Sequence, residues 1–173
     1  MPRTAGFTLI ELLIVMAIVG VVGSLAVIGT RQAKIRTAET AAIASLRTIN
    51  QGQFAFAQAC GRQAYASTLA SLGVPPPGSD SAFLSPDLTQ SDPLQKSGYV
   101  IALGGTAHPD SPPTCNGAAP LASYYLTADP LTPGHSGLRS FGTNTDRVIF
   151  GDAVTYAGNM PESGNPGHGM EIR

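Results

Sequence analysis

The sequence predicts an α+β fold, in which one long N-terminal helix packs on a small antiparallel sheet of three to four strands. Three observations support this prediction. Residues 12–29 are uncharged and mostly apolar, and no proline interrupts residues 7–60. Proline and glycine are concentrated after residue 60, between runs rich in β-branched and aromatic residues.

The first half of the predicted helix, residues 7–29, is a candidate membrane-spanning segment. Its 18 uncharged residues, 12–29, are about the minimum length for a helix that crosses a bilayer. The second half, residues 30–61, is amphipathic, and Gly61 is a plausible cap for its end. Apolar residues recur there at helical spacing along one stripe, which we expect to face the sheet: Ile35, Ala38, Ala42, Leu46, Ile49 and Phe56.

Residues 62–156 are expected to form the domain that carries the sheet, and residues 157–173 a flexible polar tail. The domain begins with a short helical piece, 65–72, followed by a loop that is rich in proline and aspartate. Strand signals follow at 98–103, 123–128, 138–142 and 147–151, with a hairpin turn at 143–146 between the last two.

Charge is distributed unevenly, although the chain as a whole has a net charge of −1. Residues 1–62 carry a net charge of +4 and residues 63–173 one of −5. Five charged residues of the helix lie mostly off the apolar stripe and are expected to form a solvated basic face: Arg31, Lys34, Arg36, Glu39 and Arg47. The basic cluster of residues 31–36 can also contact lipid headgroups or the acidic faces of neighbouring chains. Arg139 and Arg147 are too few for a nucleic-acid patch, so no nucleic acid is expected as a partner.

No pattern in the sequence indicates catalysis. The chain has no nucleophile elbow, P-loop or dinucleotide fingerprint, and the single histidines His108, His135 and His168 are expected to be solvated loop residues. The protein is therefore not expected to be an enzyme, and no cofactor is expected.

The two cysteines, Cys60 and Cys115, lack the spacing of a zinc site. If the domain is exported, they can form a disulfide. That bond would close a loop of about 55 residues, worth about 4 kcal/mol in the chain-entropy model. The alternative is a pair of free buried thiols.

Glu11 is the residue that most requires an explanation. A carboxylate inside a lipid-embedded helix costs about 2.5–3.5 kcal/mol on insertion scales, so such an acid indicates a functional site. The alternative is a plain anchor that tolerates an acid near its end.

The string Gly6-Phe7-Thr8-Leu9-Ile10-Glu11 resembles the N-terminus of type IV pilins and of type II secretion pseudopilins. The resemblance implies a type IV pilin-like fold and a leader at residues 1–6. It implies that prepilin peptidase cuts between Gly6 and Phe7 and methylates the new amine of Phe7. It also implies that Glu11 pairs with the Phe7 amine of a neighbouring subunit, and that residues 7–29 form the filament core.

The resemblance implies a structural subunit that forms a helical homo-oligomer. Its precursor would cross the bacterial inner membrane once, in contact with lipid and with inner-membrane assembly machinery. The subunit would then enter an extracellular pilus. One alternative is a pseudopilin of a periplasmic pseudopilus in type II secretion. Another is a minor tip pilin that binds surfaces or takes up DNA.

Calcium is a further possibility, because pseudopilins of the resembled family bind it near their sheet. No metal is expected here, since the chain has no tryptophan and lacks the tryptophan-bearing segment of those pseudopilins. Asp80, Asp87 and Asp92 are weak candidate ligands, since calcium takes six to eight oxygen atoms.

Overall fold

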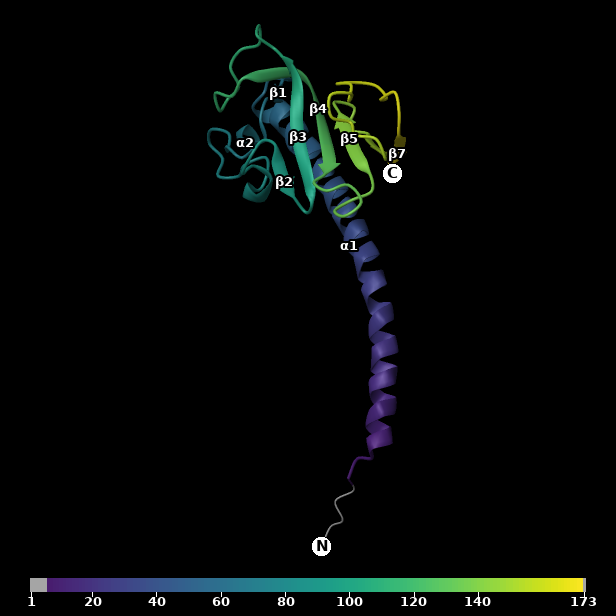
Figure 1. Cartoon of the computed structure of the whole chain (residues 1–173). Coiled ribbons are helices and arrows are strands. Elements are labelled where there is room, and N and C mark those ends of the chain that lie inside the picture. The colour runs from purple at the N-terminus through teal and green to yellow at the C-terminus, as the bar shows by residue number, and fades with distance from the viewer. Residues whose placement is uncertain (1–5, 173) are drawn as a thin grey trace.

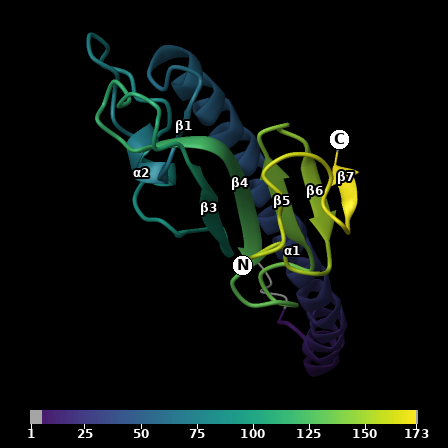
Figure 2. The same ribbon diagram turned by 90° about the horizontal axis from the view of Figure 1, so that it is seen from above.

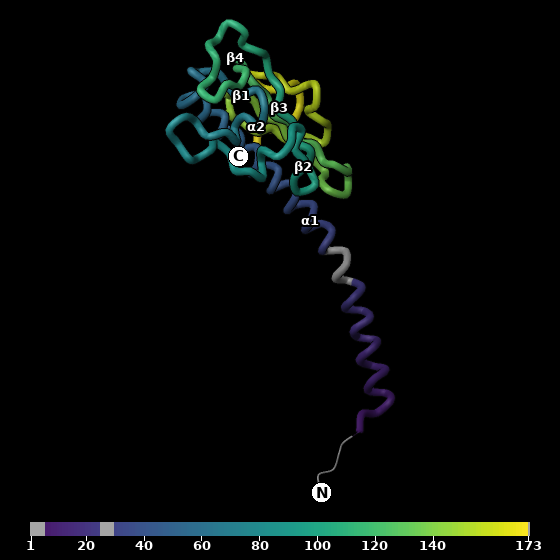
Figure 3. Tube along the Cα trace, turned by 90° about the vertical axis from the view of Figure 1, so that its left-hand side faces the viewer, coloured from purple at the N-terminus to yellow at the C-terminus, as the bar shows by residue number. Residues whose placement is uncertain are grey.

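One long helix carries an antiparallel sheet along its C-terminal half in the computed structural model, which describes residues 6–172 except for the side chains of residues 25–29 (Figure 1). Helix α1, Leu9–Ala59, has 51 residues, and it is about 76 Å long at about 1.5 Å per residue. We call the part of α1 before Ile35 the stem, and the remainder of α1 together with residues 60–172 the head. Figure 3 shows the stem extending away from the head.

Local hydrogen bonds determine where α1 begins and ends. Thr8 is the N-cap, and its side chain accepts a hydrogen bond from the backbone N–H of Glu11. At the other end, the N–H groups of Cys60 and Gly61 both donate to the carbonyl of Phe56, at 2.8 and 2.7 Å. The helix therefore begins and ends within two residues of the bounds predicted from the sequence, 7 and 61.

The sheet has seven strands in the order β2-β3-β4-β5-β6-β7, with β1 paired to β4, and every pairing is antiparallel. The elements after α1 are β1 (Tyr65–Ala66), α2 (Leu69–Leu72), the 3-10 helix η1 (Pro86–Leu88), β2 (Leu94–Lys96), β3 (Tyr99–Ala107), β4 (Pro120–Pro130), β5 (Ser140–Asn144), β6 (Ile149–Asp152) and β7 (Met170–Ile172).

The α+β fold is confirmed, but the predicted number of three to four strands is wrong. The four predicted strands correspond to β3, β4, β5 and β6. Strands β1, β2 and β7 were missed because they are two or three residues long, too short to show an alternating pattern. The β5–β6 turn also lies one residue later than predicted, closed by the N–H of Arg147 donating to the carbonyl of Asn144.

The apolar stripe of α1 packs against one face of the sheet, which Figure 2 shows lying across the helix. Leu46, Ile49 and Phe56 are fully buried, in one cluster with Leu126 and Phe141 of the sheet. Burial of each such side chain contributes about 1.5–3 kcal/mol, so this contact holds the head on α1.

Buried polar residues fix the position of α1 on the sheet. Asn50 donates to the hydroxyl of Thr143 and accepts from the hydroxyl of Tyr124, both at 2.9 Å. Gln53 makes two hydrogen bonds with the backbone of Ala66, each at 2.9 Å. Since a slipped helix would leave these groups unpaired in the interior, the network favours one register.

Two segments differ from the sequence-based expectations. Residues 65–72 are divided between strand β1 and the short helix α2, rather than forming one helical piece. Residues 157–172, expected to be a flexible tail, fold back over the sheet, where Met160 is buried and β7 pairs with β6. Residue 173 lies outside the described residues, as do residues 1–5 of the expected leader.

The sequence predicts that residues 7–29 span a membrane. Within the described part of the chain, no helix has both the length and the apolar character that a membrane crossing requires. The side chains of residues 25–29, which belong to the predicted span, lie outside the described residues.

Candidate functional site

The N-terminal candidate site consists of Gly6, Phe7 and Glu11, together with the helix cap between them. Gly6 and Phe7 precede the helix in an open conformation: Phe7 is 75% exposed, and no atom lies within 4 Å of the position of a Cβ on Gly6. The peptide bond between them therefore lies in an exposed part of the described chain, as a protease that cuts there requires.

Glu11 occupies the first turn of α1. Its backbone N–H donates to the Thr8 hydroxyl at 3.3 Å, and the Thr8 hydroxyl lies 3.5 Å from a carboxylate oxygen of Glu11. A negative charge at this position also interacts favourably with the positive end of the helix dipole. The Thr8-x-x-Glu11 spacing thus resembles a capping box, which gives Glu11 a local role at the helix N-terminus.

Glu11 makes no ion pair among the described residues. Its carboxylate is exposed, and the Thr8 hydroxyl is a weak partner at that distance. The side chain is therefore free to bind a cation supplied from outside the described chain.

The part of the stem that follows Glu11, as far as Val22, is apolar on every side. From Leu9 to Val22, its large apolar side chains are 48–82% exposed. A helix that is hydrophobic all round is stable only when lipid or other protein covers it. This surface therefore needs a partner that the single chain does not supply.

Three bases follow where the stem meets the head, and we call Arg31, Lys34 and Arg36 the basic collar. All three are exposed. Next to them Ile35, 8% exposed, is the first buried residue among the described side chains of α1. A guanidinium nitrogen of Arg31 lies 3.2 Å from Nδ1 of His135, whereas Lys34 and Arg36 have no ion-pair partner within the described chain.

Glu39, one turn beyond the collar, is buried, although its position off the apolar stripe predicts a solvated side chain. One of its carboxylate oxygens accepts from the N–H of Leu138 at 3.0 Å. The other accepts from Nε and a terminal nitrogen of Arg139, at 3.1 and 2.9 Å. No local sequence pattern indicates this pair, because its members are 100 residues apart.

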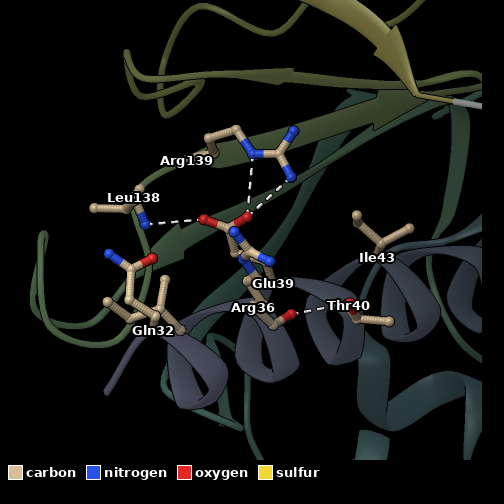
Figure 4. Close-up of a pocket in the computed structure, with 8 residues that line it drawn as sticks. Gln32, Arg36, Glu39, Thr40, Ile43, Leu138 and Arg139 are labelled. Atoms are coloured by element: carbon tan, nitrogen blue, oxygen red, sulfur yellow. Dashed lines mark hydrogen bonds and ion pairs between the residues drawn. The ribbon is translucent and has the colours of Figure 1, made fainter. Parts of the chain in front are cut away.

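The Glu39–Arg139 pair forms the floor of a shallow cavity of about 470 Å³ between α1 and the segment before β5 (Figure 4). Arg36 also lines this cavity. Glu39 is bound to Leu138 and Arg139, and Arg36 makes no ion pair in the described structure.

Cys60 and Cys115 are joined by a disulfide, which links the end of α1 to the β3–β4 connection. The backbone N–H of Cys115 also donates to the carbonyl of Cys60 at 3.0 Å. The cross-link thus ties the region just before β4 to the helix on which the sheet packs.

The three candidate calcium ligands do not form one cluster in the described structure. Asp87 pairs with Lys96, which holds the pKa of that carboxyl below its usual value. Asp92 accepts from the N–H of Leu69, and its partial burial raises its pKa. No hydrogen bond involves Asp80 in the described structure, and the described residues contain no group of three or more potential metal ligands.

His168 is not the solvated loop residue that was expected. Its ring stacks on Tyr156 with centroids 4.7 Å apart, and its Nδ1 lies 2.9 Å from Asp152. This contact lowers the pKa of Asp152, and burial raises that of Tyr156 to about 12. Because β7 follows His168 directly, these contacts hold the C-terminal segment against β6.

Comparison with known proteins adds evidence at the N-terminus. The family model described as the prokaryotic N-terminal methylation motif matches residues 1–27. No curated protein and no solved structure matches the chain. The matched segment contains Gly6, Phe7 and Glu11, the three residues singled out from the sequence. The chain therefore carries the prepilin-type signal of type IV pilins and pseudopilins.

Proposed function

We propose that this protein is a structural subunit of a type IV pilus-like filament, processed between Gly6 and Phe7 and methylated on the new amine. One observation carries the proposal: the methylation motif leads directly into a helix whose apolar side chains are exposed on every side. An exposed apolar helix directly after a cleavage site is typical of a subunit that is released from its leader and whose helix is then buried among copies of itself. A structural role also agrees with the motif, and we propose no catalytic activity.

Glu11 is proposed to align the subunits. Cleavage after Gly6 would place a positive amine on Phe7, and the exposed carboxylate of Glu11 has no ion-pair partner among the described residues. An unpaired carboxylate buried among apolar stems would be costly, whereas pairing with the Phe7 amine of a neighbour offsets much of that cost. The cation does not exist until the leader is removed, so subunits would assemble only after processing.

The proposed route of the protein follows from this chemistry. The precursor would be held at the bacterial inner membrane, where prepilin peptidase and the assembly machinery act on it. The subunit would then become part of an extracellular pilus. Two alternatives share the same N-terminal chemistry: a pseudopilin of a periplasmic type II secretion pseudopilus, and a minor tip pilin that adheres or takes up DNA. Loss of protein secretion on gene deletion would favour the first, and a low copy number in filaments the second.

The role of Glu11 is tested by Glu11→Ala, with Glu171→Ala as a matched control, because Glu171 is an exposed acid of the head whose side chain makes no hydrogen bond in the described structure. Filaments are sheared from cells and the subunit is measured in the pelleted fraction. We expect Glu11→Ala to be cleaved normally but to be lost from the pellet, and Glu171→Ala to assemble. Normal assembly of Glu11→Ala would refute the proposed pairing.

A further inference from the structure

A polar cavity lies between the middle of α1 and the turn that joins β5 to β6. Its volume is about 320 Å³, and we call it the arginine cavity. It is lined by side chains of α1 and of the turn: Arg47, Asn50, Gln51, Asp146 and Arg147. None of these residues belongs to the N-terminal site, and the proposed filament function does not use them.

The two arginines of the cavity have no counter-charge that balances them. Neither guanidinium forms an ion pair in the described structure. The carboxylate of Asp146 accepts the backbone N–H of Gly164 at 2.6 Å and forms no ion pair either. Since one carboxylate cannot neutralise two guanidiniums, the cavity keeps a net positive charge. Arg62 is also an exposed base without an ion pair, but it lies beyond the end of α1 and does not line the cavity.

Contacts within the head restrain Arg147. Its guanidinium carbon lies 4.5 Å from the centre of the Phe54 ring, which is a cation–π contact. Its backbone N–H closes the turn by donating to the carbonyl of Asn144 at 2.8 Å. The backbone of Arg147 has a φ of 63°, a conformation that is uncommon for a residue other than glycine. The turn is therefore held by its contacts rather than by the preference of Arg147 itself.

The C-terminal segment braces the same turn. Asn144 is fully buried, and its amide nitrogen donates to the carbonyls of Pro161 and Gly164, at 3.1 and 2.8 Å. The hydroxyl and the backbone N–H of Thr145 both donate to the carbonyl of Glu162. A site on a braced turn needs little ordering when a ligand binds, which favours affinity.

The helix side of the cavity supplies further donors. Asn50 is 3% exposed, and one N–H of its amide donates to Thr143, whereas the other makes no hydrogen bond in the described structure. The side chain of Gln51 is exposed and makes no hydrogen bond there either. The arginine cavity thus combines two guanidiniums with amide N–H groups that are free to donate.

We propose that the arginine cavity binds a phosphate group, as the free ion or as the monoester of a small molecule. The planar fork of an arginine matches phosphate oxygens through paired N–H···O bonds. A phosphate monoester has three acceptor oxygens, so it can bridge the two guanidiniums and still accept from an amide. A cavity of about 320 Å³ has room for the phosphate and a body of a few carbon atoms.

Equilibrium dialysis of the full chain in a mild detergent tests the site, with radiolabelled inorganic phosphate and radiolabelled glycerol 3-phosphate as the probes. Sodium chloride holds the ionic strength constant, because salt screens exposed charges. We expect saturable binding of one phosphate group per chain. Tighter binding of glycerol 3-phosphate assigns the cavity to an ester, and tighter binding of inorganic phosphate assigns it to the free ion. Failure of both probes to bind, or equally tight binding of succinate, would overturn the proposal.

Variants separate the cavity from the general charge of the head. Arg47 lies on an exposed face of α1, so Arg47→Ala is not expected to disturb the fold. Arg147→Lys keeps the charge but removes the planar fork. We expect each change to weaken phosphate binding about tenfold. Arg62→Ala is the matched control, since it removes the same charge outside the cavity, and it should leave the affinity unchanged. Equal affinities of Arg47→Ala and Arg62→Ala, with the fold of both verified by near-ultraviolet circular dichroism, would overturn the proposal.

Discussion

Replacement of Glu39 by alanine is predicted to destabilise the head more than any change to an exposed charge. The residue is 7% exposed and accepts three hydrogen bonds, at 2.9–3.1 Å, from Arg139 and Leu138. Hydrogen bonds to charged groups are each worth about 1.5–3 kcal/mol, and loss of one partner of a buried ion pair costs about 3–5 kcal/mol.

The expected cost of Glu39→Ala is smaller than the full value for a buried pair. The side chain of Arg139 is 48% exposed, so water can solvate its guanidinium once Glu39 is gone. The N–H of Leu138 would still lose its acceptor. We therefore expect a loss of about 2–3 kcal/mol in the free energy of unfolding, and a melting temperature lower by about 5–10 °C.

The assay is urea unfolding of the full chain in a mild detergent, followed by the near-ultraviolet circular dichroism of the buried tyrosines. Arg36→Ala is the matched control: an exposed base in the same cavity with no ion-pair partner in the described chain, expected to cost less than about 0.5 kcal/mol. A double-mutant cycle on Glu39→Gln and Arg139→Gln should give a coupling above about 0.5 kcal/mol. Equal stabilities of Glu39→Ala and Arg36→Ala would refute the reasoning.

Three further predictions concern the head. Replacing Cys60 and Cys115 by serine should lower the free energy of unfolding by about 4 kcal/mol, measured by the same urea titration, because the cross-linked loop spans 55 residues; an unchanged midpoint would contradict this. Asn50→Ala should cost about 1–3 kcal/mol, because it leaves two buried hydroxyl groups without their partner, and full stability would argue against the network. The hydrogen bond to His168 lowers the pKa of Asp152, so the contact should stabilise the head fully above pH 3.8, the ordinary pKa of an aspartate, and lose this effect as the pH falls further. Asp152→Asn should therefore flatten this part of the acid unfolding curve, and an unaltered curve would contradict the prediction.

The long helix and the main strands could be predicted from the sequence because their signals are local. An uninterrupted run without proline predicts α1, and the spacing of its apolar residues predicts the face that contacts the sheet. Strands β3 to β6 are four to eleven residues long, and each contains β-branched or aromatic residues. The prepilin-type signal could be recognised by its resemblance to the family for the same reason, since Gly6, Phe7 and Glu11 lie within one short stretch, and the methylation-motif model matches it.

The features that were missed depend on contacts between distant parts of the chain. Strand β7 has three residues and exists because β6 offers a free edge, which nothing in its own residues indicates. Glu39 was expected to be solvated, because only the fold brings Arg139 to it. His168 was likewise placed in a solvated loop, because its stacking on Tyr156 requires the chain to turn back over the sheet.

The central claim is that removal of the leader creates the cation that Glu11 binds when subunits assemble. The most direct test is the intact mass of the subunit in filaments sheared from the surface of cells. The account predicts a chain that begins at Phe7 and carries one methyl group on its amine. A filament subunit that retains Met1, or filaments that lack this chain altogether, would contradict it.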